Sequence, residues 1–158
     1  MAVSGGPDST ALLHLLRRVA GERKLALTAA HFDHGVRDGS RREARRVAAS
    51  CRRAGLPCRT GRARDARGAS QEELRRARYR FLEGEADRLG ADRVATGHQA
   101  DDQVETVIFR RLRGTGLRGL RGIPERRGRV VRPLLGFRRE ELQDWLRERG
   151  IGWLEDPS

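Results

Sequence analysis

Short apolar runs alternate with longer segments of helical periodicity along almost the whole chain. The apolar spacing and cap residues predict helices over residues 9–20, 40–54, 70–89, 100–112 and 138–149. Strands are expected over residues 25–32 and 93–96, with shorter ones at 2–3, near Cys58 and at 130–131. Regular alternation of strands and helices favours right-handed crossovers and a parallel sheet. We therefore predict an α/β fold with helices on both faces of the sheet.

The length and the cysteine content restrict the class of protein further. A chain of 158 residues has room for one domain with a core of its own. No apolar run reaches the roughly 18 residues of a spanning helix, and residues 1–6 lack the layout of a signal peptide. Cys51 and Cys58 can form neither a disulfide framework nor a Cys-x-x-Cys metal site. We expect a cytoplasmic protein without a membrane partner.

The charge is high and unevenly placed. The formal net charge is +12, and Arg supplies all but one of the basic residues. The segments 37–67 and 110–139 each contain eleven basic residues, against three acidic residues in the first and one in the second. Such stretches favour a nucleic-acid partner, although an arginine-rich codon usage would produce a similar composition. The 4% content of aromatic residues argues against an extended platform for stacking single strands.

Three polar clusters, at residues 4–9, 31–34 and 97–105, follow predicted strands. Ligands of parallel α/β sheets bind at the carboxyl ends of the strands, so we expect these clusters to form one site. In the first cluster, Gly5 and Gly6 allow the backbone to approach an anion closely. Pro7 suits the first turn of a helix, whose free N–H groups favour phosphate. The alternative is an ordinary glycine-rich turn with a serine cap.

The second cluster contains His31, Asp33 and His34. Two histidines and a carboxylate this close are compatible with a metal site, and equally with a polar strand end held by local hydrogen bonds. The third cluster places Asp102 and Glu105 three residues apart, on one face of a helix. Such carboxylates can hold magnesium against phosphates, or simply stabilise the start of the helix.

Residues 114–119 read Gly-Thr-Gly-Leu-Arg-Gly, which matches the dinucleotide fingerprint formally. The segment follows a helix rather than a strand, and Pro124 comes soon after it, so we reject that interpretation. A basic loop that contacts phosphate remains one interpretation of the segment, and a plain connection is the other.

Taken in order, the motifs resemble those of the tRNA(Ile)-lysidine synthases. The first, Ser-Gly-Gly-Pro-Asp-Ser, resembles the pyrophosphate loop (PP-loop) of the N-type ATP pyrophosphatases. His-Phe-Asp-His-Gly-Val-Arg, Arg-Arg-Ala-Arg-Tyr, Gly-His-Gln-Ala-Asp-Asp-Gln-Val-Glu-Thr, Arg-Pro-Leu-Leu and Trp-Leu-Glu-Asp-Pro-Ser follow in the family's order. The resemblance covers nearly the whole chain. It implies a Rossmann-like fold of the adenine nucleotide alpha-hydrolase kind over residues 1–158.

The resemblance also implies a reaction. ATP and Mg²⁺ activate the wobble cytidine of a tRNA(Ile) with a CAU anticodon, and free L-lysine then replaces AMP to give lysidine. Matching positions assign phosphate binding to residues in the first motif: Ser4, Gly5, Gly6, Pro7, Asp8 and Ser9. Catalysis falls to Asp102, Glu105 and His98, with Mg²⁺ on Asp8 and Asp102. Candidate contacts to anions or tRNA are Arg37, Arg75, Arg78 and Arg113.

Compared with the family, the chain looks shortened at both ends and lacks the C-terminal tRNA-binding domains, which leaves its activity in isolation open. A monomer and a homodimer are both compatible with the sequence. Two other functions remain open. A tRNA 2-thiolation enzyme of the same superfamily would use paired catalytic cysteines, whereas Cys51 and Cys58 lie away from the motifs. A catalytically silent RNA-binding fragment is the other.

Overall fold

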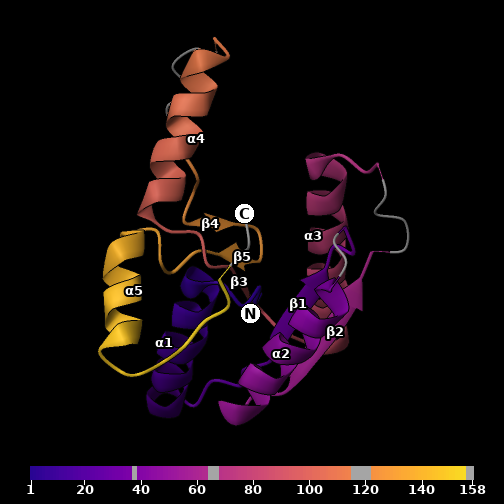
Figure 1. Cartoon of the computed structure of the whole chain (residues 1–158), viewed down its shortest axis with the longest axis vertical. Helices are drawn as coiled ribbons and strands as arrows, with labels where there is room; N and C mark the ends of the chain where they lie inside the picture. The colour runs from indigo at the N-terminus through magenta and orange to yellow at the C-terminus, as the bar shows by residue number, and fades with distance from the viewer. Residues whose placement is uncertain (37–38, 64–67, 115–121, 156–158) are drawn as a thin grey trace.

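The computed structural model describes residues 1–36, 39–63, 68–114 and 122–155 (Figure 1). The candidate anion contact Arg37 and most of the glycine-rich segment 114–119 lie outside the described residues. Five helices are described, and each matches a helix predicted from the sequence to within a few residues. They are α1 Pro7–Arg23, α2 Ser40–Arg53, α3 Gln71–Arg88, α4 Ala100–Leu112 and α5 Arg139–Arg147.

The strands form a mainly parallel sheet, as predicted. Strand β1 (Ala29–Asp33) pairs in parallel with β2 (Cys58–Arg62), and β3 (Val94–Ala95) pairs in parallel with β5 (Val130–Val131). The first three residues connect the two pairs, since Ala2 donates a backbone hydrogen bond to Ala95 and Met1 accepts one from Ala30. The predicted strand at residues 2–3 is therefore the central element of the sheet, placed between β1 and β3.

Helices cover both faces of this sheet. Alternate residues of a strand point to opposite faces, and the neighbours Ala29 and Ala30 belong to different core clusters. On one face, Val47 and Cys51 of α2 pack with Ala29, and α1 and α5 pack beside them over Ala95. On the other face, Leu82 and Ala86 of α3 pack against Ala30, Val94 and Val130. The predicted two-sided α/β architecture is confirmed.

One predicted strand is shorter than expected, and one strand was not predicted. The strand expected at residues 25–32 begins only at Ala29. Helix α1 runs on to Arg23 and ends in a left-handed Lys24, and the N–H of Leu25 donates to Ala20. The strand β4 (Arg126–Arg127) was missed; it pairs antiparallel with β5 at the sheet edge. Both residues of β4 are exposed arginines, so no apolar run marks it in the sequence.

Helix α4 is present where the sequence predicts it, but it does not pack into the core. None of its residues is buried, and the helix projects from the body of the molecule (Figure 1). Val104, Ile108 and Leu112, which recur at helical spacing, are all exposed. No helix in the described part of the chain is long and apolar enough to cross a membrane.

Candidate active site

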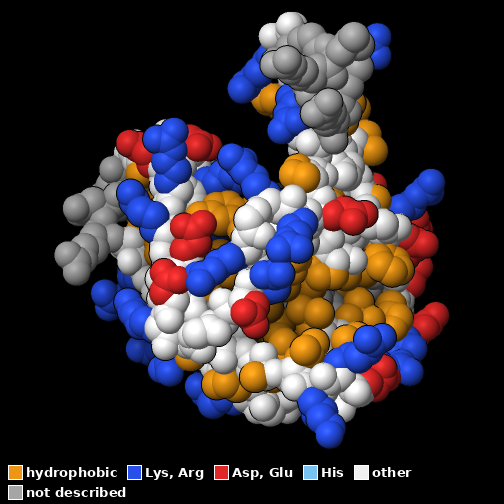
Figure 2. Space-filling model, turned by 180° about the vertical axis from the view of Figure 1, so that it is seen from behind, with side chains coloured by type: hydrophobic (Ala, Val, Ile, Leu, Met, Phe, Trp, Pro, Cys, Tyr) orange, Lys and Arg blue, Asp and Glu red, His pale blue; other side chains and the backbone are white. Residues whose placement is uncertain are grey.

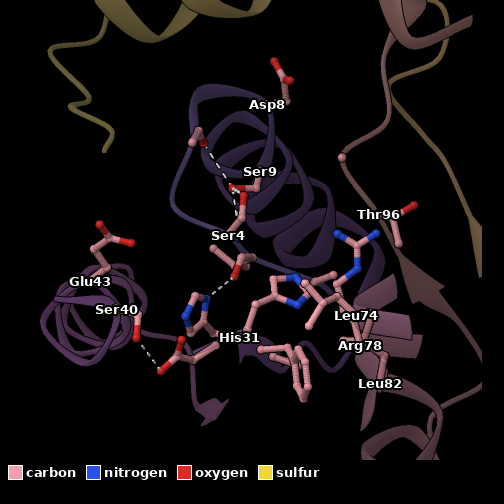
Figure 3. Close-up of a pocket in the computed structure, with 18 of the residues that line it drawn as sticks. Ser4, Asp8, Ser9, His31, Ser40, Glu43, Leu74, Arg78, Leu82 and Thr96 are labelled. Atoms are coloured by element: carbon pink, nitrogen blue, oxygen red, sulfur yellow. Dashed lines mark hydrogen bonds between the residues drawn. The ribbon is translucent and has the colours of Figure 1, made fainter. Parts of the chain in front are cut away.

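A pocket of about 730 Å³ opens at the carboxyl ends of the parallel strands, within the size range of small-molecule sites. It brings together the three polar clusters, as predicted from their positions after strands. Residues 4 and 6–9 form one wall, the end of β1 another, and the segment between β3 and α4 a third. Side chains of α2 and α3 complete it, among them Ser40, Glu43 and Arg78 (Figure 3).

The loop at residues 4–9 is held together by the hydroxyl of Ser9. This oxygen accepts hydrogen bonds from the backbone N–H groups of Ser4 and Gly5, at 3.1 and 3.0 Å, and lies 3.1 Å from the Ser4 hydroxyl (Figure 3). Ser9 is buried, whereas Ser4 is exposed. Ser9 therefore organises the loop from within, and Ser4 is the hydroxyl open to a ligand.

Helix α1 begins at Pro7, directly at this loop. The first N–H groups of a helix have no partner within it, and proline has no N–H to lose there. The N–H groups of Asp8 and Ser9 therefore belong to the unpaired first turn. Together with the helix dipole they form a site that favours phosphate.

Asp8 is the charged group at the start of α1, and it lines the pocket. Burial raises the pKa of Asp8; Arg139, whose Nε lies 3.8 Å from its carboxylate, lowers it, and the nearby Asp102 and Asp101 raise it. One oxygen of Asp8, Oδ1, is buried without a hydrogen-bond partner. A buried carboxylate oxygen without a donor, close to a second carboxylate, is a suitable ligand for Mg²⁺. The residues thus fit the predicted metal, although no cluster of three or more His, Cys, Asp or Glu is found in the described part of the chain.

The two predicted catalytic carboxylates are placed differently by the structure. Asp102 lines the pocket, and its Oδ2 accepts the backbone N–H of Gln99 at 2.9 Å, which caps α4. Glu105 lies one turn further along α4, is exposed and is not among the residues lining the pocket. The shared helical face predicted for them is confirmed, but only Asp102 is at the pocket.

His98 lies in the segment between β3 and α4, at the pocket wall. Its Nδ1 is 2.9 Å from the hydroxyl of Thr96. Burial, followed by the charge of Arg132, lowers the pKa of His98 to about 4. The imidazole is therefore neutral at pH 7 and can accept a proton or a hydrogen bond.

The close approach of this segment to the first loop depends on Gly97. A Cβ placed on Gly97 would lie 3.2–3.3 Å from backbone atoms of Asp8 and Ser9. Glycine therefore permits the contact that joins the first and third clusters.

The second cluster takes the structural role that its sequence left open. His31 Nδ1 lies 2.8 Å from the carbonyl oxygen of Val3, which ties β1 to the central strand. Asp33 accepts hydrogen bonds from the N–H of Gly35 at 2.7 Å and the hydroxyl of Ser40 at 3.2 Å (Figure 3). These contacts shape the pocket floor and leave no cluster of metal ligands there among the described residues.

The candidate anion contacts separate into two groups. Arg78 reaches into the pocket from α3, and its Nε is buried without a hydrogen-bond partner, as is Nδ1 of His34, which also lines the pocket. Arg75 is exposed on α3, with its guanidinium 5.2 Å from the ring centre of Tyr79. Arg113 follows the last residue of α4, outside the pocket, with its guanidinium 4.7 Å from the ring centre of Phe109. Of the candidates that the structure describes, only Arg78 is placed to contact a ligand in the pocket.

Sequence reasoning missed three side chains that adjust the site. Arg139 balances the charge of Asp8, Thr96 holds His98, and the buried Arg132 lowers the pKa of His98. Thr96 follows a predicted strand directly, and Arg132 opens the Arg-Pro-Leu-Leu motif, so these two carried a signal. Arg139 stands among other arginines in the sequence, and nothing there distinguishes it.

A known protein family matches the whole chain. The family described as "PP-loop domain" matches residues 1–158. The chain belongs to the PP-loop family. The phosphate loop assigned above from the backbone, residues 4–9, stands where the sequence resemblance places the loop that gives the family its name.

Several curated relatives align with all or nearly all of this chain. The chain is 38% identical over 164 residues to a tRNA(Ile)-lysidine synthase of Thermotoga sp. (strain RQ2), covering 100% of this chain and 40% of the relative. It is 44% identical to that of Symbiobacterium thermophilum, with 96% of this chain and 33% of the relative covered. For the Pseudomonas aeruginosa enzyme the identity is 44%, and the shares are 100% and 37%. The chain thus spans 33–40% of the length of these relatives.

One solved structure shows the fold independently. The U34-tRNA thiolase NcsA from Methanococcus maripaludis, solved with its [4Fe-4S] cluster, superposes with a TM-score of 0.81 at 17% sequence identity. The match covers 100% of this chain and 58% of the thiolase. At this identity the comparison confirms the α/β fold and carries no information about the reaction.

Proposed function

We propose that this chain catalyses the ATP-dependent formation of lysidine on a tRNA(Ile) with a CAU anticodon. The observation that carries the proposal is the single pocket that unites the phosphate loop with Asp102 and His98. The similarity to curated lysidine synthases over the whole chain supports the same reaction. The domain assignment over residues 1–158 is part of this proposal, and the cytoplasmic location stays a prediction.

In the first step, oxygen O2 of the wobble cytidine attacks the α-phosphorus of ATP. The bond from this phosphorus to the α–β bridging oxygen breaks, and pyrophosphate leaves. The N–H groups at the start of α1 and the Ser4 hydroxyl bind the phosphates and stabilise the developing charge. Arg78, with its unpaired Nε, faces the same pocket and offers a further donor to the phosphates.

In the second step, an amine nitrogen of lysine attacks carbon 2 of the activated base. A carbon–nitrogen bond forms, the bond from carbon 2 to O2 breaks, and AMP leaves with that oxygen. The attacking nitrogen also loses a proton, which passes to solvent water. His98 is neutral at pH 7 and lies on the pocket wall, so it is placed to position the nucleophile through a hydrogen bond.

Asp8 and Asp102 are the residues that would hold Mg²⁺. When bound, the ion neutralises phosphate charge and favours the departure of pyrophosphate. The residues contribute the unpaired Oδ1 of Asp8 and the carboxylate of Asp102 at the start of α4. The basic segments 37–67 and 110–139 supply the contacts to the tRNA backbone in this account.

The positions of the cysteines do not favour thiolation. Cys51 is fully buried in α2 and packs with Cys58 in the core cluster beneath that helix. Neither cysteine lines the pocket. Catalytic cysteines need access to the reacting base, so the thiol pair is in the wrong place for sulfur transfer to a substrate bound there.

The test is the modified nucleoside itself. The protein is incubated with an in vitro transcript of the tRNA, ATP, Mg²⁺ and L-lysine, and the RNA is digested to nucleosides for mass spectrometry. Lysidine at the wobble position is expected, and its formation should require both ATP and lysine. An unmodified cytidine, in a reaction where ATP and tRNA are both shown to bind, would contradict the proposal. A sulfur-containing nucleoside on addition of a sulfur donor would favour the thiolase instead.

A further inference from the structure

Helix α4 connects the pocket to the outside of the molecule. Its first turn carries Asp102 at the pocket wall, and Arg113 follows its last residue. At 1.5 Å per residue, the eleven steps between these positions span about 16 Å. The helix projects along this length from the body of the protein (Figure 1). A macromolecule that inserts one group into the pocket beside Asp102 can therefore contact α4 along its length.

One face of α4 points the same way as Asp102. Glu105, Phe109 and Arg113 follow Asp102 at spacings of three or four residues, which places all of them on one side of a helix. Leu112 adjoins them and is 81% exposed, and Phe109 is 59% exposed. We call the surface of Glu105, Phe109, Leu112 and Arg113 the outer face of α4.

A different side of α4 is already occupied. The side chain of Gln103 exchanges two hydrogen bonds with the backbone of Ile123, at 2.8 and 2.5 Å. Arg110 donates to the carbonyl of Gly122 at 3.1 Å. The chain therefore returns along the side of Gln103 and Arg110, and the outer face is left to solvent among the described residues.

The chemistry of the outer face suits RNA. Arg113 lies 4.7 Å from the ring centre of Phe109, so a planar cation and an aromatic ring are held together in the open. Arg110 and Arg111 add positive charge in the same last turn of the helix. Figure 2 shows hydrophobic and basic side chains interleaved along this projection. An aromatic ring offers a stacking surface to any base, and arginines neutralise phosphates.

We propose that the outer face of α4 is a docking surface for RNA, on which Phe109 and Arg113 stack against a base of the strand that enters the pocket. This inference rests on the proposed function, because it takes tRNA as the substrate of the same pocket. The low aromatic content of the chain argues against a platform that stacks several bases, but a single aromatic ring is enough to stack one base. Phe109 then acts as a binding residue outside the chemistry.

The test compares three variants and one control variant in binding to the tRNA transcript and to a single-stranded RNA of the anticodon-loop sequence. Phe109→Ala should weaken both by about tenfold, the effect of losing one base–aromatic stack, and Phe109→Trp should restore the affinity. Arg113→Gln should also reduce the dependence of log affinity on log salt by about 0.7–0.9. The control is Val104→Ala, which removes a similarly exposed apolar side chain about 140° around the helix from Phe109 and should change nothing.

Each outcome has one meaning. Wild-type affinity in Phe109→Ala, with wild type binding the RNA, overturns the docking surface and leaves the proposed function intact. No measurable RNA binding by the wild type overturns the proposed function itself. If Phe109→Ala binds RNA normally but converts a dimer to a monomer in sedimentation, the outer face pairs with a second copy of the chain. The affinity for ATP should be unchanged in all variants, which would show that the substitutions affect RNA binding alone.

Discussion

The backbone N–H of Leu154 donates a hydrogen bond of 2.9 Å to the carbonyl oxygen of Gly5. The hydroxyl of Thr10 donates to the same oxygen at 3.2 Å, so the carbonyl is fixed from two sides. Gly5 has φ +100°, and a Cβ there would lie 2.8 Å from the Leu154 side chain and 2.9 Å from that of Val47. The segment near residue 154 therefore supports the phosphate loop from the side opposite the pocket.

Leu154→Ala keeps the N–H that donates to Gly5 but removes the side chain that packs against it. ATP binding should weaken several-fold, with only a modest loss of stability because Leu154 is half-buried. Isothermal titration calorimetry with ATP and Mg²⁺ measures the effect. Leu56→Ala is the matched control, since Leu56 packs on the same core cluster without contacting the loop. Equal ATP affinity in the two variants would show that the Leu154 side chain contributes to core packing and does not support the phosphate loop.

Asp8→Asn should make the protein more stable and less able to bind ATP. Burial raises the pKa of Asp8, so at pH 7 the folded state holds a carboxylate that it disfavours relative to the unfolded chain. Removing the charge should raise the melting temperature at pH 7, and the gain should shrink as the pH falls and wild-type Asp8 becomes protonated. ATP affinity in the presence of Mg²⁺ should fall at least tenfold. A lower melting temperature with unchanged ATP binding would mean that Asp8 serves its ion pair with Arg139 instead.

The isosteric variants Asp102→Asn and Asp101→Asn separate catalysis from helix capping. Both remove one negative charge at the start of α4, at a cost of about 0.3–1 kcal/mol each. Only Asp102 lines the pocket, whereas Asp101 accepts the backbone N–H of Arg139 at 2.8 Å. We expect tRNA-dependent release of pyrophosphate to fall by about a thousandfold in Asp102→Asn and by less than fivefold in Asp101→Asn. Similar rates in both would make Asp102 a capping residue alone.

The pH dependence of stability should report His98. Its pKa is about 4 in the folded protein and about 6.5 in an unfolded chain, so between these values the unfolded state binds a proton that the folded state does not. Stability should therefore fall as the pH drops through this window. Burial also lowers the pKa of His14 and of His34, which adds to the slope. The melting temperature of wild type relative to that of His98→Gln should fall as the pH drops from 7 to 4, because only wild type carries this titrating group. A difference that stays constant would contradict the assignment.

The sequence was sufficient to predict the elements whose local apolar pattern agrees with their packing in the fold. The helices were found because their apolar stripes and caps agree with their packing, as in the capping box of Ser70 and Glu73. The pocket was located from the sequence because its polar clusters follow strands whose ends meet at one edge. The strand that was not predicted depends on tertiary contacts. Strand β4 consists of two exposed arginines, and it is defined by its pairing with β5.

The apolar pattern of α4 predicts the helix correctly but does not predict how the helix packs. Val104, Ile108 and Leu112 recur as in a core-facing helix, yet they are exposed. A periodic apolar stripe indicates that a helix has an apolar face, but it does not identify the surface that covers this face. Likewise, the three-residue spacing of Asp102 and Glu105 places them on one face, but only the packing of α4 shows that the pocket ends at Asp102.

The position at which ATP is cleaved tests the central claim most directly. The protein is incubated with α-phosphate-labelled ATP, Mg²⁺, L-lysine and the tRNA with the CAU anticodon, and the nucleotide products are separated. The account predicts AMP and pyrophosphate in equal amounts, formed only when the tRNA is present, because the phosphate loop and Asp102 direct attack to the α-phosphorus. Formation of ADP and inorganic phosphate, or AMP release that is indifferent to the tRNA, would contradict it.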